Sequence, residues 1–280
     1  MRREPAMALN PDWIVPDWPA PAWVHAVCTT RAGGVSKPPY DRMNLGDHVG
    51  DAARDVAANR SNFARQIGAK PVFLSQVHKA DVVQLGKGMP DGSLADGCVT
   101  RLPGLACTIM VADCLPVLFA NSLGTVVAAA HAGWRGLLGP ASASAPRGVL
   151  ESCYKEFEAL ALTNISNDAI KNIVNNTLVW LGPCIGPDQF EVGPEVRDAF
   201  VGQDPQNAVF FKPSGKLKWL ADLAGLARLR LRALGVTQIY GNDGSRDWCT
   251  ASNPSRFFSH RRDGAALGGS GRMAAAVWID

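Results

Sequence analysis

The stretch Thr125-Val126-Val127-Ala128-Ala129-Ala130-His131-Ala132-Gly133-Trp134-Arg135-Gly136 joins an apolar run to a loop bounded by glycines. A short apolar run with β-branched residues, followed by such a loop, predicts a buried strand that ends near His131. A histidine at a strand end projects from a rigid sheet into a crevice lined by loops, where functional groups usually collect. The segment therefore predicts a sheet in the core and a functional side chain at its edge.

Two other segments show the same arrangement. The strand pattern of 73–77 stops at His78, and the strand pattern of 109–111 is followed by Asp113-Cys114 and a chain-turning proline. Two imidazoles and one thiolate form a borderline-soft ligand set that suits zinc, and three protein ligands leave a fourth position for water or substrate. A water in that position becomes a source of hydroxide near neutral pH. We therefore expect His78, Cys114 and His131 to form one open, catalytic metal site.

Two carboxylates are candidates to support these ligands, Asp113 beside Cys114 and Asp96 in Ala95-Asp96-Gly97. Asp96 and Asp113 are candidates for the groups that orient the two histidines. The gaps between the three ligands, 114 − 78 = 36 and 131 − 114 = 17, match no compact zinc signature. Because spacing does not decide the matter, a second interpretation stays open, with Cys114 as a nucleophile and His131 or His78 as its base.

The rest of the chain alternates between strand and helix patterns. Strands are expected near 72–78, 106–111, 116–120, 125–131, 177–182, 236–240 and 273–279, and helices at about 51–67, 147–161, 194–202 and 219–234. Mixed strands and helices in one continuous chain predict an α/β or α+β domain. Surface loops are expected at 139–147 and 163–176.

Arginines on two of these helices receive opposite interpretations. In 51–67, Arg60 shares the apolar stripe of Val56 and Phe63, so its side chain is expected to be buried. A buried arginine needs an anion, which is either an internal carboxylate or a ligand phosphate. In 219–234, Arg228 and Arg232 lie off the apolar face and are expected to be solvated.

Composition limits the class of protein. With 280 residues, 47% hydrophobic and 19% charged, the chain is expected to be globular. The net charge is +3 and neither half is strongly basic, which gives no case for a nucleic-acid or membrane partner. Prolines interrupt the N-terminal segment, as they would not in a signal peptide, and no stretch is apolar enough for a membrane helix. Seven scattered cysteines, an odd number, fit a reducing compartment, so we expect a cytoplasmic protein without disulfides.

Several motifs together resemble one known family. Gln76-Val77-His78, Ala112-Asp113-Cys114-Leu115-Pro116 and His131-Ala132-Gly133-Trp134-Arg135-Gly136 occur in that order. Further matches are 30–36, 44–46, 59–60, 182–186, 190–193, 249–250 and 258–264. The combination, over about residues 23–279, resembles the YfiH-like family, long called polyphenol oxidases or laccase-domain proteins and now regarded as purine nucleoside phosphorylases and peptidoglycan editing factors.

The resemblance implies a fold, a metal and an activity. It implies a single domain over 23–280 behind an N-terminal arm of 1–22, with two stacked mixed sheets and helices on the outer faces, in four layers (α-β-β-α). It makes His78, Cys114 and His131 the ligands of Zn²⁺, with copper as the alternative metal. It also implies phosphate-dependent cleavage of adenosine, inosine or methylthioadenosine, with adenosine deamination as a side activity.

Phosphorolysis requires a site for a dianion. Arg60, Arg135 and Arg261 are the candidates for phosphate or substrate contacts, since arginine forks match phosphate oxygens. In deamination, a carboxylate such as Asp96 is a candidate for moving protons. The partners expected are therefore a purine nucleoside and phosphate.

Three rival functions remain at this stage. The first is a copper-dependent polyphenol oxidase, although the chain has only five histidines and a multicopper centre needs many. The second is a Cys–His hydrolase acting in peptidoglycan precursor editing. The third is a non-enzymatic protein in which zinc is merely structural.

Overall fold

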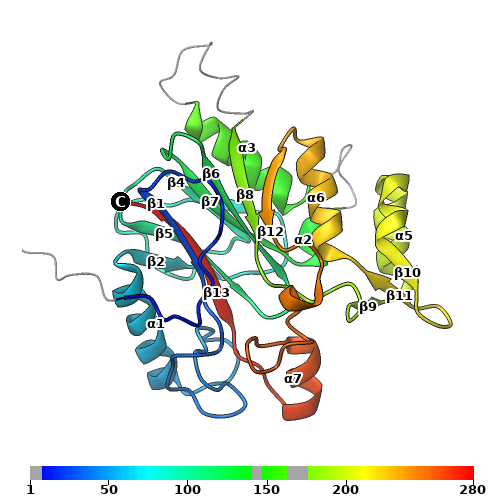
Figure 1. Cartoon of the computed structure of the whole chain (residues 1–280), viewed down its shortest axis with the longest axis horizontal. Helices are drawn as coiled ribbons and strands as arrows, with labels where there is room; N and C mark the ends of the chain where they lie inside the picture. The colour runs from blue at the N-terminus through cyan, green and yellow to red at the C-terminus, as the bar shows by residue number, and fades with distance from the viewer. Residues whose placement is uncertain (1–7, 141–146, 163–175) are drawn as a thin grey trace, which may run out of the picture.

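The computed structural model describes residues 8–140, 147–162 and 176–280. Two large β-sheets pack face to face, and helices cover their outer faces (Figure 1). The first sheet has the order β1 (Val24–Cys28), β13 (Met273–Ile279), β5 (Leu105–Val111) and β2 (Lys70–Phe73). Its β2–β5 pair is parallel and its other pairs are antiparallel, so this sheet is mixed.

The second sheet is larger and carries most of the candidate site. Its order is β12 (Gln238–Gly241), β8 (Thr177–Leu181), β6 (Leu115–Asn121), β7 (Val127–Ala132), β4 (Gly97–Thr100) and β3 (Val82–Gln84). The outermost pairs, β12–β8 and β3–β4, are parallel, whereas the central pairs are antiparallel. Because β6 and β7 are central, the residues at their ends are held by neighbouring strands on both sides.

The central strands are buried on both faces, which explains their unbroken apolar sequences. In β5, Cys107 and Ile109 enter the core between the two sheets, while Ala106 and Met110 enter the core beneath the helix α1 (Ala53–Ile67). Successive side chains of a strand point to opposite faces, so a strand between two apolar layers needs apolar residues at every position.

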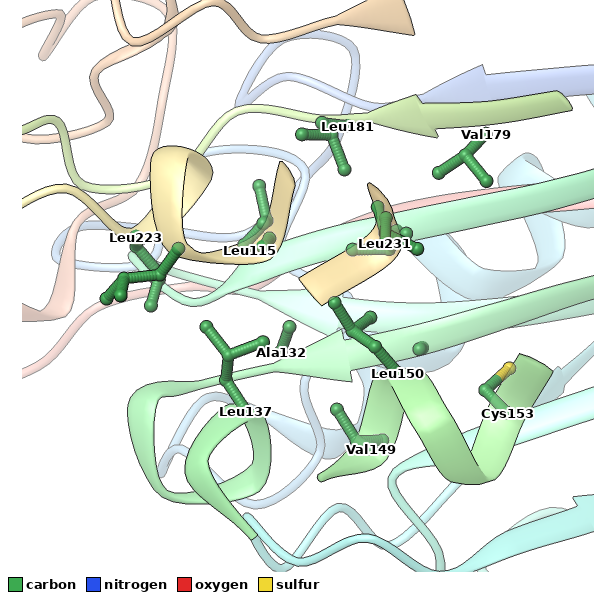
Figure 2. Packing of buried hydrophobic residues seen from close by; sticks show 14 of the residues in the cluster. Leu115, Ala132, Leu137, Val149, Leu150, Cys153, Val179, Leu181, Leu223 and Leu231 are labelled. Carbon is green, nitrogen blue, oxygen red and sulfur yellow. The ribbon is translucent and has the colours of Figure 1, made fainter. Parts of the chain in front are cut away.

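Helices close the two outer faces. The first sheet is covered by α1, and the second by α2 (Trp134–Leu138), α3 (Val149–Ala161) and α6 (Leu223–Ala233). Figure 2 shows Leu150 of α3 and Leu231 of α6 gathered with Leu115 of β6 and Leu181 of β8 in one apolar cluster. The predicted four-layer α+β fold with two stacked mixed sheets is confirmed.

A third, small sheet was not predicted. It consists of β10 (Phe211–Pro213), β11 (Trp219–Ala221) and β9 (Glu191–Val192), and lies with α5 (Pro194–Gln203) at the end of the molecule far from α1 (Figure 1). Three further elements lie in the described part of the chain. They are η1 (Pro205–Phe210), η2 (Arg246–Trp248) and α7 (His260–Leu267).

Two expectations for the region 219–234 are wrong. The helix begins at Leu223 and not at 219, because the Asp222 side chain accepts a hydrogen bond from the N–H of Gly225 and caps it there. Arg228 is not a solvated residue: its guanidinium donates to the carbonyls of Ile239 and Asn242 and ties α6 to β12.

The division into an arm (1–22) and a domain (23–280) stays a prediction. Within the proposed arm, Trp13 is buried and its ring lies 5.6 Å from that of Phe63 on α1, while Ile14 forms a β-bridge with Cys28. Most of the two loops expected at 139–147 and 163–176 lies outside the described residues. In the part of the chain that is described, no helix is both long and apolar enough to span a membrane.

Candidate metal centre

His131 lies near the end of β7, where the sheet and a buried carboxylate fix its ring. Its backbone N–H donates to the carbonyl of Asp96 (2.7 Å), and its Nδ1 lies 2.8 Å from Asp96 Oδ1. Asp96 is fully buried immediately before β4. Since Nδ1 is occupied by the carboxylate, Nε2 is the nitrogen that remains free to bind a ligand.

The same carboxylate shapes the loop that carries His78. Asp96 accepts hydrogen bonds from the backbone N–H groups of Val77 (3.1 Å), His78 (2.9 Å) and Lys79 (2.8 Å). Three consecutive amides can point at one anion only if the chain curls, and His78 accordingly has a φ of 59°. Burial alone raises the pKa of Asp96, but the bonds from His131 and these amides outweigh it and lower the pKa.

The predicted strand over 72–78 is therefore wrong beyond Phe73. β2 ends at Phe73, and His78 lies in a turn that Asp96 organises. The role predicted for Asp96, orienting both histidines, agrees with this geometry. Proton transfer by Asp96 does not, because its oxygens accept four hydrogen bonds and it is inaccessible to substrate.

Cys114 reaches the site from the turn between β5 and β6. Its Sγ lies 3.8 Å from His78 Nε2. Asp113, just before it, does not contact either histidine ring, contrary to expectation. Its Oδ1 accepts from the hydroxyl of Thr250 and its Oδ2 from the backbone N–H of Arg261, each at 2.6 Å.

The three candidate ligands converge. One donor atom from each of His78, Cys114 and His131 lies within 4.8 Å of the other two, and the imidazole rings meet nearly edge to face with centroids 4.7 Å apart. Zinc bonds of about 2.0–2.3 Å in tetrahedral geometry place donors roughly 3.5 Å apart. The residues present therefore fit a zinc ion after small side-chain adjustments.

Two glycines after His131 are required by close approach of the chain to the site. A Cβ on Gly133 would lie 2.9 Å from Cys114 Sγ and 3.0 Å from His78 Cδ2. A Cβ on Gly136 would lie 2.8 Å from the carbonyl oxygen of Lys79. Both contacts are shorter than van der Waals distance, so this loop closes over the site only with glycine at these positions.

The thiol and the buried imidazole polarise each other. Burial raises the pKa of Cys114, but His131 and His78 more than offset it and lower the pKa to about 6. Burial lowers the pKa of His131, whereas Cys114 and Asp96 raise it to about 9. Both shifts favour a thiolate at Cys114 beside an imidazolium at His131, and a thiolate is the form that binds zinc.

The three predicted substrate arginines lie in different surroundings. Arg60 is half-buried and has an internal partner, since its Nη2 lies 3.1 Å from Asp47 Oδ1 and its guanidinium covers the ring of Phe73. Arg135 is exposed and stacks on Trp134. Arg261 is exposed on α7, and its Nη1 donates to the carbonyl of Glu191.

A cavity of 510 Å³ brings the predicted Arg261 together with residues that the sequence did not single out. Its lining includes His48, His260, Arg261 and Arg272. Burial lowers the pKa of Arg272, and the negative charges of Cys114 and Asp113 oppose this, which places its guanidinium in electrostatic reach of the site. Burial lowers the pKa of His48 too, assisted by Arg272 and Arg60.

No local pattern marked His48 or Arg272. His48 lies outside the expected strands and helices, and Arg272 follows a glycine-rich stretch without helix or strand periodicity. They meet only because β13, the 47–50 loop and the Cys114 turn converge in three dimensions. Of the other two predicted arginines, Arg60 lowers the pKa of His48, which lines the cavity, whereas Arg135 does not line the cavity.

Known proteins match nearly the whole chain. A family model described as multi-copper polyphenol oxidoreductase laccase matches residues 25–280. A Pseudomonas aeruginosa protein named purine nucleoside phosphorylase is 45% identical over 97% of this chain and 98% of its own length. The Escherichia coli purine nucleoside phosphorylase YfiH is 46% identical over 95% and 98%, respectively.

Solved structures agree with the sequence matches. A crystal structure of a Neisseria meningitidis protein superposes with a TM-score of 0.81 at 42% identity, covering 96% of this chain and 99% of that one. Bacillus licheniformis YfiH gives a TM-score of 0.77 at 26% identity, with coverages of 92% and 93%. On both counts, this chain belongs to the laccase-like polyphenol oxidoreductase family that includes the YfiH proteins.

Proposed function

We propose that this chain is a purine nucleoside phosphorylase that depends on one zinc ion held by His78, Cys114 and His131. The observation that carries the proposal is the convergence of these three donors, together with a cavity lined by cationic side chains, one of which, Arg272, lies within electrostatic reach of Cys114. The names of the relatives support it, because two proteins about 45% identical over nearly their full length are called purine nucleoside phosphorylases.

Zinc is the metal proposed because the ligand set is mixed. Two imidazoles and a thiolate are borderline-soft donors that suit zinc, while copper remains the alternative because it binds such sites more tightly in the usual series. When bound, zinc supplies Lewis-acid polarisation and activation of water at an open position. Asp96 keeps His131 Nδ1 engaged, and so directs Nε2 to the metal.

The phosphate site is proposed at the cationic wall of the 510 Å³ cavity. Arg272 and Arg261 line it directly, and Arg60 contributes positive charge through its position near His48. Arginines suit a phosphate dianion because their donors match its oxygens. Arg135, exposed in the first turn of α2, is kept as a contact for the rest of the substrate.

The substrates proposed are adenosine, inosine and methylthioadenosine. In phosphorolysis a phosphate oxygen forms a bond to C1′ of the ribose, the C1′–N9 bond breaks, and the leaving purine takes up a proton. The protein's part is to hold phosphate and nucleoside in line and to stabilise the developing charges. Adenosine deamination is proposed as a side activity of the same metal site, with Asp96 in a positioning role only.

Two alternatives each have an observation in their favour. The family description favours a copper-dependent polyphenol oxidase. However, among the described residues His78, Cys114 and His131 are the only group of three or more His, Cys, Asp or Glu side chains that could hold a metal ion, and His25 is engaged by Asp280. A Cys–His hydrolase in peptidoglycan precursor editing, which would need no metal, is favoured by a different feature. His131 interacts with the Cys114 thiol, and its Nδ1 is hydrogen-bonded to Asp96, as in a nucleophile–base–carboxylate triad.

The partners and compartment are proposed on similar grounds. The cavity size and charge suit a small anionic co-substrate and a nucleoside. Six of the seven cysteines are buried and all are free, as in a reducing cytoplasm.

The test is a product assay of purified protein with adenosine, with and without phosphate. We expect adenine and ribose 1-phosphate only when phosphate is present, loss of this activity with a chelator, and its return with zinc. Activity that survives complete metal removal would favour the hydrolase, and oxidation of phenols that requires copper would favour the oxidase.

A further inference from the structure

Asp113 has an unusual backbone conformation for its position. It stands between the end of β5 and the candidate ligand Cys114, and its φ is 87°. A residue other than glycine adopts positive φ at a cost, unless surrounding contacts hold it there. The contacts of Asp113 therefore need an explanation beyond the turn itself.

Those contacts join three distant segments to the Cys114 turn. The carboxylate accepts from Thr250 Oγ1 and from the N–H of Arg261, both at 2.6 Å, and the backbone carbonyl accepts from the N–H of Ile185 at 2.9 Å. The partners are 72, 137 and 148 residues away in sequence, from 185 − 113, 250 − 113 and 261 − 113. One residue thus links four pieces of chain at the site.

The bond to Arg261 serves as a helix cap supplied from outside the helix. The N–H of Arg262 is satisfied by Ser259 Oγ and that of Asp263 by the carbonyl of Ser259. The N–H of Arg261 is satisfied by Asp113. A carboxylate at a helix N-terminus is favoured by the unpaired amides and by the helix dipole.

α7 forms one wall of the cavity proposed to bind phosphate. His260, Arg261, Gly264 and Ala265 line the cavity from this helix, and His48 also lines it. Asp113 accepts a hydrogen bond from α7 and is adjacent in sequence to Cys114. The position of this wall relative to Cys114 therefore depends on Asp113.

We propose that Asp113 is a positioning residue that holds α7 at a fixed distance from the metal ligands and thereby sets the affinity for phosphate. The effect on the KM for phosphate rests on the proposed function, whereas the effect on hydrogen exchange of the α7 amides does not. Asp113 touches neither substrate nor metal in this role. It acts through α7.

The experiment compares three variants of the zinc-loaded full chain. Asp113→Gly keeps the positive φ and removes the carboxylate, whereas Asp113→Asn keeps one acceptor for the Arg261 N–H and a donor for Thr250 Oγ1. The matched control is Asp222→Gly, which removes the comparable carboxylate cap of α6. Metal content is measured for each protein, so that loss of zinc is separated from displacement of the wall.

We expect Asp113→Gly to raise the KM for phosphate about tenfold or more at full zinc occupancy, as fits loss of a charged hydrogen bond, with a much smaller change in kcat. Asp113→Asn should restore most of the affinity, and Asp222→Gly should leave the KM near the wild-type value. Hydrogen exchange of the α7 amides should become faster in Asp113→Gly only.

Unchanged α7 exchange in Asp113→Gly would overturn the inference, as would an equal rise in KM in Asp222→Gly. Zinc loss with normal KM in the remaining holoenzyme would also overturn it, since Asp113 would then serve the metal turn alone. If the wild-type protein performs no phosphorolysis, the proposed function fails, while the α7 exchange still decides whether Asp113 holds the helix.

Discussion

At the scale of single residues, Asp96 holds two of the proposed ligands at once. It accepts from the His78 N–H and faces His131 Nδ1 through the same oxygen, and its other oxygen accepts from Val77 and Lys79. Nothing in the short sequence Ala95-Asp96-Gly97 specifies four partners. The sequence indicated only that Asp96 was a candidate to orient the two histidines. Which groups its oxygens meet depends on how β4 pairs with β7.

Asp96→Asn should weaken zinc binding by about 10- to 100-fold, the usual effect of losing a partner of a ligating histidine. The amide nitrogen of asparagine would face N–H donors and leave them unsatisfied. Competition with a chromophoric chelator measures the affinity, with Asp243→Asn in an exposed turn as the control. An affinity equal to that of the wild type would contradict the orienting role.

Cys114 should be the reactive thiol of the metal-free protein. Its pKa is lowered to about 6, while burial raises the pKa of Cys28 to about 12. A lowered pKa means that thiolate is already formed at neutral pH and is lost as the pH falls through about 6. Alkylation at residue 114, followed by mass spectrometry, should therefore rise with a midpoint near pH 6 and level off above it. A midpoint near pH 9 would contradict the effect of His131 and His78 on the Cys114 thiol. So would alkylation that zinc does not reduce at any cysteine.

At the scale of elements, the sequence predicted strands and helices best where burial is uniform. β5, β6 and β13 appear within a residue or so of the expected ranges, because strands buried on both faces are apolar throughout. The predicted boundaries are wrong where a side chain distant in sequence binds the backbone and overrides the local hydrophobic pattern. Leu74 and Val77 favoured a longer strand, but the Asp96 carboxylate draws the amides of 77–79 into a turn.

Gly133→Ala tests the close contact between the ligand loop and the site. The backbone φ of Gly133 is −69°, so alanine is tolerated conformationally and any effect comes from its Cβ meeting Cys114 Sγ and His78. We expect zinc affinity to fall at least about tenfold while the fold persists. Gly202→Ala in α5 meets no atom within 4 Å and should be neutral or slightly stabilising. Equal zinc affinity in both variants would contradict the geometry.

At the scale of the whole molecule, the layers are held together by apolar packing. Three apolar clusters, under α1, between the sheets and under α3 and α6, hold the fold. The layer order followed from the family resemblance, and the strand pattern alone gave only the class. The cationic cavity was not predictable because its residues, such as His48 and Arg272, are 224 positions apart, from 272 − 48.

Removal of the metal should therefore abolish activity without unfolding the protein. After chelation the far-ultraviolet circular dichroism should be unchanged. The free energy of unfolding should fall only by the binding free energy of the lost ion, and the thermal midpoint should fall accordingly. A chelated protein without secondary structure would mean that the metal is a structural element of the core.

The central claim is that His78, Cys114 and His131 bind one metal ion together. X-ray absorption spectroscopy at the zinc edge, on protein purified without added metal, tests it most directly. We predict one zinc per chain, with one sulfur at about 2.3 Å and at least two nitrogen ligands at about 2.0–2.1 Å. The sulfur should vanish from the spectrum in Cys114→Ser, or the zinc should be lost altogether. Zinc that keeps a sulfur ligand in that variant, or wild-type protein that is fully active without metal, would contradict the account.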